Sequence, residues 1–109
     1  MHVDVTARGE VSQTVKRHAR EKIGALDRYA GLRALRAHVV LTQDRNPRIE
    51  RPAHAACQID LTGPVIGGHV DDVEMRHAID ALAKRMEHQL RRFVDRHRDD
   101  ERRLPAETD

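Results

Sequence analysis

The chain has 109 residues, of which 39% are apolar and 35% are charged, and its formal net charge is +2. These values predict one globular domain with a single modest core, and the near balance of charges makes their placement more informative than their sum. No stretch approaches the roughly 20 apolar residues of a membrane span, and the N-terminus lacks an apolar segment of signal-peptide length. The lone cysteine, Cys57, fits a reducing compartment. We therefore expect a cytoplasmic protein with no membrane partner.

The first half of the chain predicts a strand, a helix and a second strand. Residues 2–7 alternate between apolar and polar side chains, which is typical of a half-buried strand. Ser12 is a suitable N-cap for a helix that runs to about Tyr29, before Gly31. Residues 34–43 alternate again and predict the second strand. The side chains expected to face inward are Val3, Val5, Ala7, Val15, Ala19, Ile23, Leu26, Ala30, Ala37, Val39 and Leu41.

The second half predicts two further strands and a long helix. A charged, Pro-bounded loop (residues 44–52) precedes a strand at 53–61, and a tight turn leads to the last strand at 65–70. Asp71 or Asp72 caps the helix. The inward side chains expected on the third strand are Ala55, Cys57, Ile59 and Leu61. The order is therefore β-α-β-β-β-α, which predicts an α+β, two-layer sandwich with both helices on one face of a four-stranded sheet.

Residues 1–95 form the predicted folded domain. From residue 96 to residue 109 apolar side chains almost disappear, and Pro105 is expected to end the helix. This segment is expected to be a charged, disordered tail or the start of a linker.

The second helix has an apolar stripe flanked by basic residues. At 100° per residue, its stripe falls within about 80° and comprises Met75, Ile79, Leu82, Met86, Leu90 and Phe93. One border of the stripe carries Arg85, Arg92, Arg96 and Arg103, and the far side carries Lys84, Arg91, Arg98 and Arg102. The chain has 17 Arg and 3 Lys, and Arg pairs with phosphate through two parallel hydrogen bonds. These rows predict a polyanion-binding surface. The alternative is an ordinary solvated face, because Asp80, Glu87, Asp95 and Asp99 interrupt the rows.

The first helix repeats this pattern. Its basic side chains Lys16, Arg17, Arg20 and Arg28 fall in an arc of about 120° away from the apolar face, and Lys22 lies on the other side. We expect the basic rows of the two helices to join into one broad positive surface. Tyr29 and Phe93 are the only Phe, Tyr or Trp residues, so contacts with nucleic acid should be made to phosphate and sugar, not by stacking on bases.

Catalysis is not expected. No Gly-rich phosphate loop precedes a helix, because Gly67 and Gly68 lie inside a predicted strand. Ser12 is needed as a helix cap, and Cys57 lies on the buried side of its strand, where cysteine is usually a core residue. We therefore predict no catalytic residue, no cofactor and no small-molecule substrate.

Histidines are frequent on the outward side of the predicted strands. His2, His38, His54 and His69 share this side with Asp4, Asp60 and Asp71. Neighbouring strands could bring two or three of these together, and imidazole with carboxylate suits zinc. However, the set has no short ligand spacing, and the strand register cannot be read from sequence. The prediction is a histidine-rich, mildly pH-sensitive surface and no metal site.

Three segments together resemble a known family. They are VTARGEVSQTVKRHAREKIGALDRY, then AHVVL, then EMRHAIDALAKRMEHQLRR, and the likeness spans about residues 2 to 95. The chain resembles the ribosome hibernation promoting factors, also called ribosome-associated inhibitors or sigma modulation proteins. The resemblance implies the same β-α-β-β-β-α order, related to double-stranded-RNA-binding domains, and no enzymatic activity. It also implies binding in the mRNA and tRNA channel of the small ribosomal subunit, which silences ribosomes in stress or stationary phase.

By position, the resemblance assigns rRNA contacts to Lys22, Arg85, Arg91 and Arg92. Glu74-Met75-Arg76 stands where the family usually has Asp-Met-Tyr, and His88 stands where a basic residue is common. Nothing here matches the second, dimerising domain of longer members. With the helical pattern, the candidate rRNA-binding residues are Lys16, Arg17, Arg20, Lys22, Arg28, Lys84, Arg85, His88, Arg91, Arg92 and Arg96. The alternatives are a general binder of structured RNA and a protein-interaction module.

Overall fold

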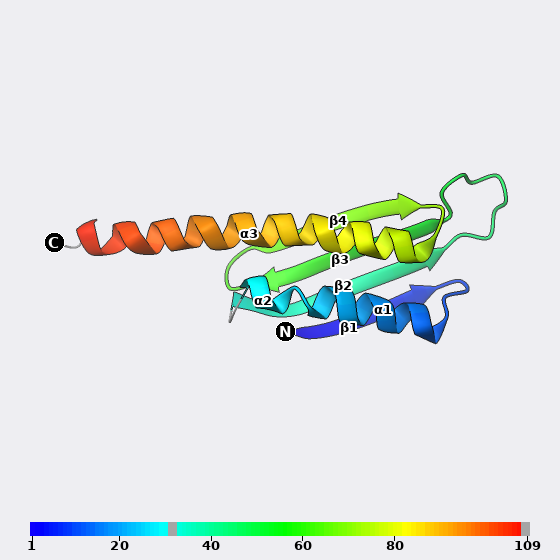
Figure 1. The fold of residues 1–109 in the computed structure, drawn as a ribbon, viewed down its shortest axis with the longest axis horizontal. Coiled ribbons are helices and arrows are strands. Elements are labelled where there is room, and N and C mark those ends of the chain that lie inside the picture. The colour runs from blue at the N-terminus through cyan, green and yellow to red at the C-terminus, as the bar shows by residue number, and fades with distance from the viewer. Residues whose placement is uncertain (31–32, 108–109) are drawn as a thin grey trace.

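Four strands form one mixed sheet, and the helices cover one of its faces (Figure 1). The computed structural model describes the backbone of residues 1–30 and 33–107, and the side chains of residues 1–30 and 33–96. Its elements are β1 (His2–Arg8), α1 (Gln13–Gly24), α2 (Asp27–Ala30), β2 (Ala34–Gln43), β3 (Ala53–Leu61), β4 (Val65–Asp72) and α3 (Met75–Glu107). The predicted α+β sandwich is confirmed, with α2 as an additional short helix.

The strands lie in the order β1-β2-β3-β4, so that each strand is next to its neighbours in sequence. β1 pairs with β2 in parallel, and the other two pairings are antiparallel. The turn after β1 requires glycine, because Gly9 has a φ of 82° and a Cβ there would lie 2.3 Å from the carbonyl oxygen of Gln43. The register Val39↔Cys57↔Gly68 places these three residues in one row across β2, β3 and β4.

The core lies between the sheet and the helices. Most side chains predicted to face inward from the second and third strands are fully buried, including Val39, Leu41 and Ile59. Cys57 is 4% exposed and belongs to this core, and its burial raises the pKa of the thiol to about 12. The α3 stripe contributes Ile79 and other side chains of its inward face. In the described part of the chain, no helix combines the length and apolar character of a membrane span.

The first helix is shorter than the sequence predicts. α1 begins after Ser12, whose Oγ accepts a hydrogen bond from the Val15 amide at 3.2 Å, as expected for the N-cap. It ends at Gly24 instead of about Tyr29, and α2 then follows as a separate turn. Glycine is unfavourable within helices, so Gly24 favours an end at this point. After the chain changes direction, Leu26 is still buried in the core. Gly31, the expected stop, lies outside the described residues.

α3 begins at Met75 and has 33 residues. Asp72 accepts hydrogen bonds from the amides of Val73 and Glu74, so it orders the turn before the helix and is not itself the N-cap. The backbone helix passes Pro105, its predicted end, and reaches Glu107, so that α3 extends well beyond the sheet (Figure 1). The assignment of residues 96–109 to a tail or linker remains a prediction.

Candidate nucleic-acid interface

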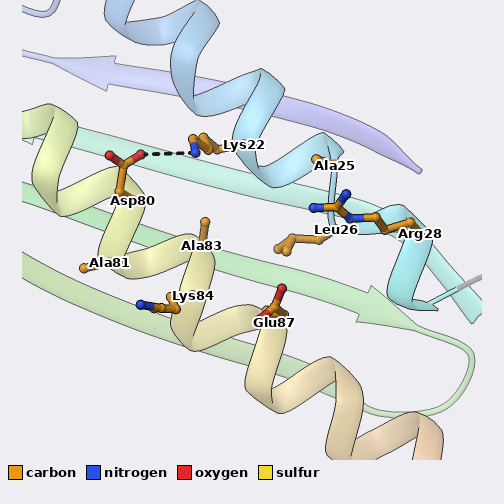
Figure 2. A pocket seen from close by; sticks show the side chains of 9 residues that line it. All are labelled: Lys22, Ala25, Leu26, Arg28, Asp80, Ala81, Ala83, Lys84 and Glu87. Atoms are coloured by element: carbon orange, nitrogen blue, oxygen red, sulfur yellow. Dashed lines mark ion pairs between the residues drawn. The ribbon is translucent and has the colours of Figure 1, made fainter.

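A groove runs between α1 and α2 on one side and α3 on the other (Figure 2). Its volume is about 600 Å³. The lining side chains are Lys22, Ala25, Leu26, Arg28, Asp80, Ala81, Ala83, Lys84 and Glu87. Three cations therefore share this groove with two carboxylates. We call it the inter-helix groove.

Asp80 joins the two long helices across this groove. Its Oδ1 atom lies 2.7 Å from His18 Nε2 and 3.9 Å from Lys22 Nζ. Both partners lie on α1, so the carboxylate fixes the spacing of the helices while it compensates the charge of Lys22 (Figure 2). The net positive charge of the groove is correspondingly reduced.

A second cluster, centred on Tyr29, joins α2 to α3. The guanidinium carbons of Arg28 and Arg91 lie 5.0 Å and 4.7 Å from the centroid of the Tyr29 ring. Arg91 Nη2 also lies 4.0 Å from Glu87 Oε1. A hydrogen bond from the Tyr29 side chain, then the charges of Arg91, His88 and Arg28, lower the pKa of Glu87. Arg28 and Arg91 are therefore partly committed to packing the helices together.

The opposite side of α3 faces the edge of β4 and is more uniformly basic. Two hollows lie there, with volumes of about 540 and 440 Å³. Their cationic or titratable lining residues are Lys84, Arg85, His88, Arg92 and Arg96. Among the described residues, no carboxylate lines either hollow. We call these five residues the basic flank.

The spacing along α3 explains the basic flank. Arg85, Gln89, Arg92 and Arg96 follow one another at intervals of three or four residues, which places them on one side of a helix. Gln89 lines both hollows and donates a 2.7 Å hydrogen bond to the carbonyl oxygen of Gly67. Gln89 was not among the residues predicted to have a functional role, although its position four residues after Arg85 places it on the same flank.

The basic residues of α1 divide between two sides of that helix. Lys22 faces α3, whereas Lys16, Arg17 and Arg20 lie between about 120° and 160° around α1 from it. Lys16, Arg17 and Arg20 are not among the described residues that line the inter-helix groove or the two hollows of the basic flank. Arg28 belongs to α2, so the predicted arc on one continuous helix is wrong. The helices bring Lys22, Arg28 and Lys84 together at the inter-helix groove, whereas the single broad positive surface and RNA contacts by Lys16, Arg17 and Arg20 stay predictions.

Neither aromatic side chain is a free stacking platform. Tyr29 is half-buried and is covered by two guanidinium groups, and Phe93 is half-buried against the core. Two other residues that shape this interface, His18 and Tyr29, were not predicted from the sequence. Each contacts a partner more than 50 residues away. A polyanion on this surface would meet guanidinium and ammonium groups, which bind phosphate oxygens.

Solved structures share this fold. The N-terminal domain of Protein Y from Thermus thermophilus is 28% identical, with a TM-score of 0.71 over 85% of this chain and 99% of that one. A ribosomal subunit interface protein from Coxiella burnetii is 17% identical, with a TM-score of 0.71 over 87% and 99% of the two chains, and this likeness supports the fold alone. A comparison with curated proteins found no match.

A family model extends this likeness to most of the sequence. The model described as Sigma 54 modulation protein / S30EA ribosomal protein matches residues 3–98. That range contains β1 from its second residue, the other three strands, α1, α2 and the part of α3 that carries the basic flank. The resemblance inferred from the three sequence segments is confirmed, and the chain belongs to the Sigma 54 modulation protein / S30EA ribosomal protein family.

Proposed function

We propose that this chain is a ribosome hibernation factor that binds the small ribosomal subunit in the mRNA and tRNA channel and represses translation under stress or in stationary phase. The observation that carries the proposal is the basic flank, whose two hollows are lined by Lys84, Arg85, His88, Arg92 and Arg96 and by no carboxylate among the described residues, on a member of the Sigma 54 modulation protein / S30EA ribosomal protein family. The contacts are made to the phosphates of folded rRNA. Repression is competitive, because the bound protein occupies the space that mRNA and tRNA need.

The geometry of arginine makes this flank suited to phosphate. A guanidinium group has five N–H donors, so Arg85 can hold the strand edge with Nη1 and present other donors to an RNA backbone. Lys84 and Arg92 are exposed, and in the described part of the chain neither makes an ion pair. They are the side chains whose loss should affect binding without loss of a structural contact.

The test is co-sedimentation with purified small subunits of a double variant, Lys84→Glu with Arg92→Glu. The matched control is Arg48→Glu with Arg51→Glu, which makes the same change in charge in the loop between β2 and β3, away from the helices. We expect the first variant to lose co-sedimentation and the control to retain it. Equal loss in both variants, or retention in both, contradicts binding through the basic flank.

Arg85 and Arg91 are poor choices for this test. Arg85 holds β4, and Arg91 stacks on Tyr29 beside Glu87, so charge reversal at either position disturbs the packing as well as the surface. Reversal of Arg85, Arg91 and Arg92 together would therefore change the packing as well as the binding surface.

Competition experiments address the channel and the two alternatives. Pre-bound tRNA and mRNA should prevent binding of the protein to small subunits if all three occupy the same channel. A free RNA duplex that competes as well as intact subunits would indicate a general binder of structured RNA. Association with other cell proteins that survives nuclease treatment, without binding to purified subunits, would indicate a protein-interaction module.

A further inference from the structure

Three side chains with metal-binding atoms meet on the sheet face opposite the helices. His54 on β3 is paired directly with Asp71 on β4, and His69 precedes Asp71 by two residues on the same strand face. The neighbours of His54, Ala53 and Ala55, are fully buried toward the helices, so the His54 ring lies on the outer side. The strand register, which the sequence could not supply, therefore brings together two of the four outward histidines.

The three groups are in direct contact. His54 Nδ1 lies 2.5 Å and His69 Nε2 lies 2.8 Å from the same Asp71 oxygen, Oδ1. The ligand atoms of the three residues all lie within 4.8 Å of one another. In the part of the chain that the structure describes, this is the one group of three such residues. Two imidazole nitrogens and one carboxylate oxygen form a donor set that zinc and related divalent transition ions prefer.

We propose that His54, His69 and Asp71 bind a divalent transition-metal ion, with zinc as the reference ion, on the outer face of β3 and β4. The three side chains supply three coordination positions. The exposed fractions of the His54, Asp71 and His69 side chains are 30%, 41% and 59%, so the remaining position is open to water or to a group from a partner.

The site needs only a small rearrangement to accept the ion. Ligands of a tetrahedral zinc ion with bonds of about 2.0–2.1 Å are about 3.3 Å apart, somewhat farther than the two nitrogen–oxygen distances in the structure. Metal binding displaces the hydrogen atoms between Asp71 and the two rings. In neutral imidazole each hydrogen moves to the other ring nitrogen, so the rings stay neutral. The two nitrogen–oxygen distances then lengthen by about 0.5 to 0.8 Å, and the two ring nitrogens, which lie within 4.8 Å of each other, take up a similar spacing.

Asp44 supports the tautomer that the ion requires. Its Oδ2 atom lies 4.0 Å from His54 Nε2, on the side of the ring away from Asp71. The position of Asp44 is itself fixed, because its amide donates to the Pro52 carbonyl at 2.8 Å and its Oδ1 accepts from the Asn46 amide at 3.0 Å. At 4.0 Å the two atoms are not hydrogen-bonded, but the charge of Asp44 favours the tautomer with its hydrogen on Nε2, which leaves Nδ1 available to the metal.

The nearly parallel rings of His54 and His69 also indicate that the ligands are in place before an ion binds. The His54 and His69 ring centroids lie 6.4 Å apart, with only 9° between the ring planes. Both rings are borne by hydrogen-bonded strands, so their backbone positions are fixed by the sheet and not by a loop. The proposal does not depend on ribosome binding, because the basic flank is on α3 on the other face.

The test is a titration of the 109-residue protein with zinc sulfate by isothermal titration calorimetry at neutral pH. We expect one ion per chain, and binding at least about tenfold weaker in His54→Ala, His69→Ala and Asp71→Asn. The matched control is His38→Ala, which removes an outward histidine on β2 that is not part of the group. Far-UV circular dichroism identifies variants that fold, and the nearly isosteric Asp71→Asn variant decides the case if an alanine variant does not.

Cobalt supplies an independent readout. Co²⁺ in a three-ligand site of this kind should give visible d–d absorption that zinc abolishes and that Asp71→Asn lacks. The proposal is overturned if the protein takes up no zinc, if Asp71→Asn and His69→Ala bind zinc as the unmodified chain does, or if His38→Ala is as weak as they are.

Discussion

Arg85 on α3 donates a 2.5 Å hydrogen bond from Nη1 to the backbone carbonyl oxygen of His69 on β4. One helical turn later, Gln89 makes the same kind of bond to the carbonyl oxygen of Gly67. β4 is an edge strand, and alternate carbonyl groups of an edge strand have no partner strand. The flank of α3 that we propose for RNA binding therefore also completes the hydrogen bonding of the sheet edge. Binding and folding share these side chains.

Replacement of Arg85 by alanine should lower the free energy of unfolding by about 1 kcal/mol, because a hydrogen bond to the strand edge is lost. Urea denaturation followed by circular dichroism measures this change. The control is Arg92→Ala on the same flank, for which the expected change is within about 0.5 kcal/mol. Equal stability of the two variants would show that the Arg85 bond to β4 contributes nothing.

Close packing of α3 on β4 depends on Gly68. A Cβ at this position would lie 3.0 Å from Met86 Sδ and 3.4–3.5 Å from Arg85 Cδ and Leu82 Cδ1. We expect Gly68→Ala to lower the free energy of unfolding by about 1 kcal/mol, at the low end for overpacking, because the Met86 side chain can partly move away.

The neighbouring glycine supplies the control for this prediction. At Gly67 an added Cβ meets only the Cys57 carbonyl oxygen, at an ordinary 3.5 Å. Gly67→Ala should therefore be neutral or slightly stabilising, since glycine is unfavourable inside strands. Urea denaturation of both variants checks the difference, and a Gly67→Ala variant as unstable as Gly68→Ala would contradict the packing argument.

The strands were predictable because their signal is local. Apolar and polar side chains alternate along residues 34–43 and 53–61, and β2 and β3 have those bounds in the structure. The break after Gly24 was not predictable in this way. Ala19, Ile23, Leu26 and Ala30 are spaced as on one continuous helix, yet the chain turns and buries all four from α1 and α2.

The flanks of each helix were also predictable, but their partners were not. Helical geometry places Arg85 and Arg92 on one side of the α3 stripe without any tertiary information. The pairing of His18 with Asp80 joins residues that are 62 positions apart, and it depends on how α1 lies against α3. The contact of His54 with Asp71 depends on strand register, which alternation does not specify between strands.

The Tyr29 hydroxyl should control the ionisation of Glu87. Because its hydrogen bond lowers the pKa of Glu87, Tyr29→Phe should raise that pKa toward the ordinary value of about 4.3. A lowered folded-state pKa means that the linked stabilisation is present at neutral pH and is lost as the pH falls through the folded pKa. Tyr29→Phe should therefore flatten the loss of stability that follows as the pH falls below the ordinary glutamate pKa of about 4.3.

Carboxyl-carbon NMR titration of Glu87 measures this shift. Phenylalanine retains the ring that Arg28 and Arg91 cover, so the variant isolates the hydroxyl from the stacking. Tyr29→Leu removes both and should raise the pKa at least as far. An unchanged Glu87 titration in Tyr29→Phe would mean that the charges of the neighbouring cations, and not the hydroxyl, set the pKa.

Salt dependence distinguishes RNA binding through the basic flank from binding that also uses the side of α1 that carries Arg17. Binding through phosphate contacts weakens as salt rises, and each lost contact reduces the slope of log K against log salt concentration by about 1. We expect this reduction for Lys84→Ala and for Arg92→Ala in equilibrium binding to purified small subunits. Arg17→Ala, on the side of α1 that lies away from the basic flank, should leave the slope unchanged. If Arg17→Ala reduces the slope as much as Arg92→Ala, the RNA extends around α1, and the broader surface predicted from the sequence is the binding surface.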